Sequence, residues 1–235
     1  MRRLGIIQPG RLGDIIICLP IAKWYSDRGY EIIWPIEHSY VRNFAGYVDY
    51  VNFVGIDSLD CNAARKECVP NCNTVLDLSI TFPNSHPYND SMFYQNRDKL
   101  TFDQIKYEFA NVPFVEKWNL TFRRDIEAEQ QLENKIRNSA ELFTLAHTRG
   151  SSEEFNYRPE VNESVIYVSD ITPSIFDWCG LIEKANKVVA LESCFATLVE
   201  QTDLFKGNEK IFVPRQADVR AFYVSDWKVF DNKLC

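Results

Sequence analysis

Residues 4–25 read LGIIQPGRLGDIIICLPIAKWY, and this stretch holds a short polar turn between two apolar segments. Leu4–Gln8 is rich in isoleucine and stops at Pro9-Gly10, which predicts a β-strand followed by a tight loop. The dense apolar positions after Asp14 predict a helix buried against a sheet, with Asp14 as its N-cap. A further apolar strand is predicted at 31–36, so the order indicates a parallel βαβ unit of the expected ~30-residue size.

The same alternation continues along the chain and predicts an α/β protein of two Rossmann-like lobes, with parallel sheets flanked by helices. In the first lobe we expect strands at 51–56 and 74–80 and helices at 59–68, 102–110 and 125–137. In the second lobe we expect strands at 142–146, 165–168, 187–191 and 211–213 and helices at 174–185 and 193–202. No linker or repeat marks a boundary, so the pattern alone assigns the lobes to 1–138 and 139–235.

Composition excludes several classes of protein. Hydrophobic residues make up 46% and charged residues 25%, which is the balance of a chain that buries a core. The net charge of -7 repels phosphate backbones, so nucleic acid is not an expected partner. The first apolar run is too short for a secretory signal, and no window approaches the ~20 apolar residues of a transmembrane helix. We therefore expect a cytoplasmic protein whose contact with a membrane, if any, is peripheral.

The seven cysteines form an odd set, and most lie in apolar runs where a reduced thiol behaves as a small hydrophobic group. Cys61, Cys68 and Cys72 are the exception, because they fall in a polar segment. Their spacing matches no common zinc template with a fourth ligand nearby, so we interpret them as incidental thiols and expect no metal site.

The turn Gln8–Asp14 is the sharpest local feature for chemistry. Gly10 and Gly13 permit a tight backbone at the carboxyl end of the first strand, which is the edge where open α/β sheets bind ligands. The following helix N-terminus can hold an anion, whereas Asp14 can accept a proton from an attacking sugar hydroxyl. Asp14 as a helix cap alone is an equally open interpretation. The pattern departs from both the dinucleotide and the P-loop fingerprints.

Three segments resemble one family. Gly13–Pro20, GDIIICLP, resembles the N-terminal signature of the ADP-heptose:lipopolysaccharide heptosyltransferase family. Residues 177–193, DWCGLIEKANKVVALES, resemble the family's donor-lobe segment L-I-x-x-A-x-x-V-V-x-x-D-[ST]-G-P-x-H. The turn AHTRGSS at 146–152 resembles the Gly/Ser-rich turn after the first strand of that lobe. The resemblance implies a GT-B-like fold and an inverting glycosyltransferase that uses neither a metal nor a cofactor.

The resemblance also implies roles for single residues. A glycan or lipid-linked glycan acceptor would bind the first lobe, where Asp14 is the catalytic base in the loop of Gly10, Arg11 and Gly13. A nucleotide-sugar donor would bind the second lobe. The donor residues implied are Glu192 and Ser193 at the sugar or ribose, and Arg149, Ser151 and Ser152 at the diphosphate. His147 either contacts phosphate or is a structural hydrogen bonder, and Arg149 either stabilises the leaving group or is a solvated turn residue.

The chain departs from the family pattern, which makes it a divergent and short member. The donor-lobe segment differs from the family pattern at three places: it has Glu192 in place of Asp, Cys194-Phe195 in place of Gly-Pro, and Thr197 in place of His. The resemblance therefore does not predict the donor sugar. These changes favour an alternative function, a non-catalytic nucleotide or glycan binder. An NAD-dependent enzyme is the second alternative, but it requires a glycine fingerprint that the sequence lacks. Aromatic residues between 102 and 122 have helical spacing, which favours core packing over sugar stacking.

Overall fold

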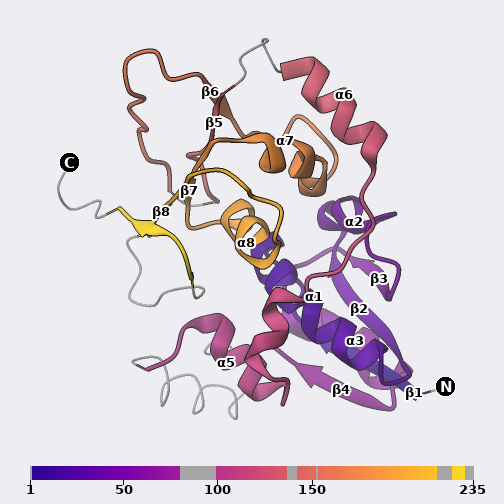
Figure 1. The fold of residues 1–235 in the computed structure, drawn as a ribbon. Helices are drawn as coiled ribbons and strands as arrows, with labels where there is room; N and C mark the ends of the chain where they lie inside the picture. Colours follow the sequence, from indigo (N-terminus) through magenta and orange to yellow (C-terminus); the bar gives the residue numbers. More distant parts are fainter. Residues whose placement is uncertain (1, 80–98, 137–141, 152, 216–223, 231–235) are drawn as a thin grey trace. The chain divides into compact units, whose positions relative to one another are not determined.

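A computed structural model describes residues 2–79, 99–136, 142–151, 153–215 and 224–230 (Figure 1). Contacts divide the chain into two compact units, of which the first ends at Arg123 and the second begins at Arg124. Each unit holds one parallel sheet with helices packed on it, so the chain has the expected α/β fold of two Rossmann-like units. No described helix combines the length and the apolar character that a bilayer crossing requires.

The first unit contains a four-stranded sheet in the order β3-β2-β1-β4 (Figure 1). Its elements are β1 (Arg2–Ile7), α1 (Leu12–Ser26), β2 (Tyr30–Glu37), α2 (His38–Phe44), β3 (Val51–Ile56), α3 (Cys61–Asn71), β4 (Thr74–Asp77), α5 (Phe102–Phe109) and the 3-10 helix η1 (Phe114–Trp118). All pairings are parallel, and Leu4 of β1 lies opposite Ile32 of β2 and Thr74 of β4. This is the strand order of a Rossmann half-sheet, whose topological switch point lies between β1 and β4.

The second unit contains a five-stranded parallel sheet in the order β6-β5-β7-β8-β9. Its elements are α6 (Ile126–Ile136), β5 (Thr144–His147), β6 (Val165–Tyr167), the 3-10 helix η2 (Ile175–Trp178), α7 (Cys179–Lys184), β7 (Lys187–Leu191), α8 (Cys194–Gln201), β8 (Glu209–Val213) and β9 (Lys228–Val229). Numbered within the unit, the order is the 2-1-3-4-5 of flavodoxin-like sheets, so the switch point lies between β5 and β7.

The core of the first unit explains why its sequence is so apolar. All eight residues of α1 from Ile15 to Ala22 are buried, as expected for a helix that covers a parallel sheet. Helix α3 packs against β1 at Gly5, where an added Cβ atom would lie 2.7 Å from the Cβ atom of Cys68. The missing side chain at Gly5 therefore lets the helix approach the strand closely.

Of the aromatic residues of α5 and η1, Phe102 and Tyr107 belong to the core, Phe109 and Phe114 are half-buried and Trp118 is exposed. Tyr107 is fully buried, and its ring meets that of Phe114 edge to face at 5.4 Å. Phe114 meets Trp118 in the same manner at 5.5 Å. These edge-to-face contacts agree with the packing interpretation, because the rings pack against one another.

Several local predictions differ from the structure. Asp14 is not the N-cap of α1: the cap is Arg11, and Asp14 is the third residue of the first turn. The predicted helix at 174–185 is broken at Trp178 into η2 and α7. The short α2 and β9 were not predicted, since seven and two residues are too few to show a periodic pattern.

The helix expected at the end of the first lobe groups with the second unit. Helix α6 packs against η2 and α7, and Arg124 just before it pairs with Glu129 of α6 and with Glu183 of α7. These contacts are not visible in the local sequence, which is why the pattern suggested a boundary after this helix rather than before it.

Candidate active site

The turn after β1 is held by hydrogen bonds to its own backbone carbonyls. The indole Nε1 of Trp34 donates to the carbonyl of Gln8 at 2.9 Å, and the amide of Glu37 donates to that of Pro9 at 3.0 Å. The side-chain Nε2 of Gln8 donates to the carbonyl of Gly10 at 2.7 Å. Strand β2 and the Gln8 side chain therefore fix the path of the turn at the switch point of the first sheet.

The end of the turn is a reciprocal cap on α1. The amide of Arg11 donates to Oδ2 of Asp14 at 3.0 Å, and the amide of Ile15 donates to the carbonyl of Arg11 at 3.1 Å. Asp14 therefore acts as a capping residue, from the third helical position. A carboxylate has two oxygens and about four acceptor positions, so a capping bond is compatible with proton acceptance.

The two glycines of the turn differ in their surroundings. Gly10 is buried, and an added Cβ atom would lie 2.5 Å from Cδ2 of Leu59 and 3.0 Å from Cε2 of Tyr40. The Gly10–Arg11 peptide bond is cis. Gly13 is half-buried in the first turn of α1, beside the half-buried Asp14.

A lysine that sequence reasoning missed reaches this edge from α5. The Nζ atom of Lys106 lies 2.5 Å from Oε1 of Gln8 and 2.6 Å from the carbonyl oxygen of Leu78. Gln8 follows β1 and Leu78 follows β4, so the lysine spans the switch point. A lysine within a predicted helix is expected to be exposed to solvent, and the neighbouring sequence does not indicate that Lys106 is buried.

In the second unit, two residues of the predicted donor site meet at the switch point. His147 ends β5 and Ser193 lies between β7 and α8, and their Nδ1 and Oγ atoms are 3.0 Å apart. The Ser193 hydroxyl also accepts the amide hydrogen of Ala196 as the N-cap of α8. The His147 ring stacks on Phe195 at 5.4 Å. Burial lowers the pKa of His147 to about 4, so its imidazole is neutral at pH 7.

Glu192 has a different environment from its neighbour. It is buried, its Oε2 accepts the amide hydrogen of Arg215 at 3.0 Å, and its own amide donates to the carbonyl of Val213. The carboxylate thus holds the segment that follows β8.

The predicted phosphate-facing turn is a small hairpin directly after β5. Arg149 forms an antiparallel bridge with Glu154, and the amide of Gly150 donates to the carbonyl of Glu153 at 2.8 Å. Arg149 and Ser151 are exposed on this hairpin, while Ser152 lies outside the described residues. The structure therefore presents Arg149 two residues beyond His147 on the same edge of the second sheet.

Cys61 and Cys68 of α3 and Cys72, which follows the helix, are free thiols that pack in one cluster with Ile7 of β1. Burial raises the pKa of Cys68 to about 12 and also raises the pKa values of Cys61 and Cys72, which keeps the thiols protonated. In the part of the chain that the structure describes, no three His, Cys, Asp or Glu side chains gather as metal ligands.

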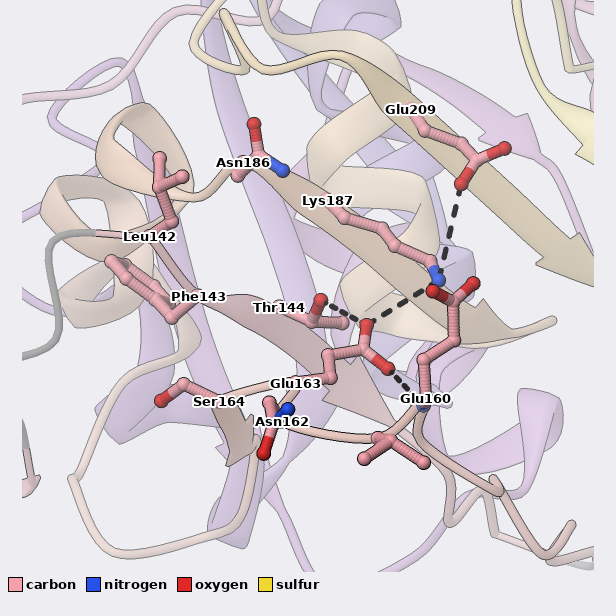
Figure 2. Close-up of a pocket in the computed structure, with 11 residues that line it drawn as sticks. Leu142, Phe143, Thr144, Glu160, Asn162, Glu163, Ser164, Asn186, Lys187 and Glu209 are labelled. Atoms are coloured by element: carbon pink, nitrogen blue, oxygen red, sulfur yellow. Dashed lines mark hydrogen bonds and ion pairs between the residues drawn. The ribbon is translucent and has the colours of Figure 1, made fainter.

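A polar cavity of about 390 Å³ lies at the opposite, amino-terminal edge of the second sheet (Figure 2). Glu163 lies at its centre: it accepts hydrogen bonds from Thr144 at 2.6 Å and from the amide of Glu160 at 2.9 Å, and pairs with Lys187 at 3.3 Å. Burial by itself would raise the pKa of Glu163, but these partners and Tyr157 outweigh it and lower the pKa to about 2. We interpret this network as a structural tie between strands, away from the ligand-binding edge.

No protein-family model matches the sequence, and no curated protein matches it. The fold, however, is similar to that of solved glycosyltransferases. E. coli heptosyltransferase WaaC with ADP-2-deoxy-2-fluoro heptose has a TM-score of 0.54 and 14% identity, over 98% of this chain and 93% of that one. The family 9 glycosyl transferase from Veillonella parvula DSM 2008 has a TM-score of 0.64 and 11% identity, over 99% and 86% of the two chains.

A third similar structure is the iron-containing dodecameric glycosyltransferase TibC from enterotoxigenic E. coli H10407, with a TM-score of 0.62 and 13% identity. The alignment spans 100% of this chain and 65% of that structure's chain. At such identities the likeness establishes the fold. That fold is the GT-B-type α/β architecture with two parallel sheets, as the resemblance in the sequence implied.

Proposed function

We propose that this chain is a glycosyltransferase that moves a sugar from a nucleotide-sugar to a hydroxyl group of a glycan or lipid-linked glycan. The observation that carries the proposal is the 3.0 Å contact between His147 and Ser193 beside the Arg149 hairpin. These residues come from two separate segments that resemble heptosyltransferase donor motifs, and they meet at the edge of the sheet where α/β proteins bind nucleotides.

In the proposed reaction, Asp14 removes the proton of the acceptor hydroxyl. The oxygen then attacks the anomeric carbon of the donor, while the bond from that carbon to the diphosphate oxygen breaks. The configuration inverts because one displacement occurs, and the proton remains on Asp14. No metal or cofactor is invoked in these steps.

The leaving nucleoside diphosphate gains negative charge as this bond breaks. The guanidinium group of Arg149 and the hydroxyl group of Ser151 are exposed on the hairpin and suited to bind it. His147 is neutral at pH 7, so it contributes hydrogen bonding rather than charge.

A non-catalytic nucleotide or glycan binder is the second candidate function. The burial of Glu192 favours it, because this carboxylate binds the backbone of Arg215 as a structural residue would. Such a protein would bind nucleotide and turn nothing over.

One experiment separates the two functions. Nucleotides and nucleotide-sugars are titrated against the native protein and Arg149→Ala by calorimetry, and the best ligand is then used in turnover assays with Asp14→Asn as the control. Binding with turnover supports the transferase, and binding without turnover supports the binder. No binding to any nucleotide would overturn the transferase and the nucleotide binder, and would leave only a glycan binder.

A further inference from the structure

Lys106 is a buried cation that the proposed chemistry does not use. Its side chain is fully buried, yet among the described residues it forms no ion pair, and its hydrogen-bond acceptors are the neutral oxygens of Gln8 and Leu78. Its ammonium group also lies 4.1 Å from the centre of the Phe102 ring. Burial lowers the pKa of Lys106. Removing an ammonium group from water is costly, so its retention calls for a specific role.

The neighbouring Lys117 shows the usual way to bury a lysine. It is equally buried, but it pairs with the buried carboxylate of Asp103 at 2.7 Å. Lys117 therefore has a compensating charge within its own region of the core. Lys106 instead donates hydrogen bonds to Gln8, which follows β1, and to Leu78, which follows β4.

The contacts with Lys106 and with the Gly10 carbonyl together determine how the Gln8 amide is oriented. An ammonium group only donates hydrogen bonds, so the Gln8 oxygen must face Lys106 and the amide nitrogen must face away. That nitrogen donates to the carbonyl of Gly10 at 2.7 Å. The next residue, Arg11, donates its amide hydrogen to Asp14. A chain of defined hydrogen bonds thus runs from the buried cation to the proposed catalytic carboxylate.

We propose that Lys106 is a positioning residue, which through Gln8 holds the turn that carries Asp14 in its active conformation. The proposal rests on the proposed function for its catalytic meaning. The positioning itself is a property of the folded protein and can be measured without any substrate.

Two variants break the chain at different points. Lys106→Met keeps the length of the side chain but removes the donor to Gln8. Gln8→Glu keeps an acceptor for Lys106 but removes the donor to Gly10. Lys117→Met is the matched control, because it also removes a buried ammonium from the first unit but does not touch the turn.

Hydrogen exchange of the amides of residues 11–15 is measured at matched distances below each variant's Tm. We expect both Lys106→Met and Gln8→Glu to raise exchange at these amides by about tenfold or more, and Lys117→Met to leave them unchanged. Equal exchange in Gln8→Glu and the native protein would overturn the proposal. If Lys106→Met fails to fold, Gln8→Glu still tests the link from Gln8 to Gly10 without which Lys106 cannot position the turn.

Turnover assays add a second readout. We expect kcat to fall in both variants while the KM for the donor is kept, since the proposed donor residues lie in the other unit. If the native protein transfers no sugar, the proposed function fails, but the exchange data still test the positioning. If transfer occurs and exchange does not respond to either variant, the positioning inference fails alone.

Discussion

The Nδ1 atom of His147 lies 3.0 Å from the Oγ atom of Ser193, although 46 positions separate the two residues in sequence. The contact joins the ends of the adjacent parallel strands β5 and β7, which pair from Thr144 and Lys187 onward. Ser193 also caps α8, so one hydroxyl links a strand end, a buried imidazole and a helix N-terminus. These contacts tie the end of β5 to the N-terminus of α8.

The buried imidazole predicts a pH dependence of stability. The pKa of His147 is lowered from 6.5 to about 4, so the unfolded chain binds a proton more readily than the native protein between these values. The free energy of unfolding of the second unit should fall as the pH falls from 6.5 towards 4, and should level off with respect to this group below that. Urea unfolding at a series of pH values measures this free energy. The signal comes from a probe in the second unit, such as Trp178.

His147→Gln should flatten this part of the pH profile. His38→Gln is the control, because the His38 side chain is 61% exposed. A profile that stays as steep in His147→Gln as in the native protein would show that other groups cause it.

Asp14 can be tested for its two roles separately. Asn at position 14 retains an oxygen that accepts the Arg11 amide hydrogen, so Asp14→Asn should change the free energy of unfolding by less than ~1 kcal/mol. Asn cannot act as a base, so kcat should fall by about 10²–10⁴-fold. Asp14→Ala should lose both the cap and the turnover. Turnover and urea unfolding of both variants check this, and native-like kcat in Asp14→Asn would leave only the capping role.

Arg149 should contribute to nucleotide binding without contributing to stability. It is exposed on the hairpin, so Arg149→Ala should leave Tm unchanged. Loss of a charge-assisted hydrogen bond should raise the Kd for a nucleoside diphosphate by about tenfold or more. Calorimetric titration measures this, with the exposed Arg158→Ala as a control for the general loss of positive charge. The same Kd in Arg149→Ala and Arg158→Ala would reject a specific role for Arg149.

Gly5 should be required for the packing of α3. An Ala Cβ atom there would lie 2.7 Å from the Cβ atom of Cys68, which cannot move without the helix backbone. Gly5→Ala should therefore lower the free energy of unfolding by ~1–3 kcal/mol. Cys72→Ser, at the residue that follows α3, is a useful comparison, because it changes a half-buried thiol without adding volume. Equal stability of Gly5→Ala and the native protein would mean that α3 shifts at little cost.

The fold was largely predictable because its strands are local apolar runs. The predicted strands at 51–56 and 187–191 agree with β3 and β7 to the residue, since both are short apolar runs that end at an acidic residue. Position within a helix was harder to predict. The prediction that Asp14 is the N-cap of α1 was wrong, because the structure has Arg11 at the cap and Asp14 at the third helical position.

The long-range parts of the site could not be predicted. The meeting of His147 with Ser193 depends on strand order, and the burial of Lys106 depends on how α5 packs under the turn. Neither relation produces a pattern in the neighbouring sequence from which it could be predicted. The resemblance predicted His147 and Ser193 as donor residues, but it did not predict the contact between them. It also gave no role to Lys106.

The division of the chain at Arg123 and Arg124 has a consequence for substitutions. The proposed base and the proposed leaving-group ligand belong to sheets with different strand orders, and each sheet has its own core. Substitutions at the proposed donor residues of the second unit should therefore leave the folding of the first unit intact, and the reverse should also hold.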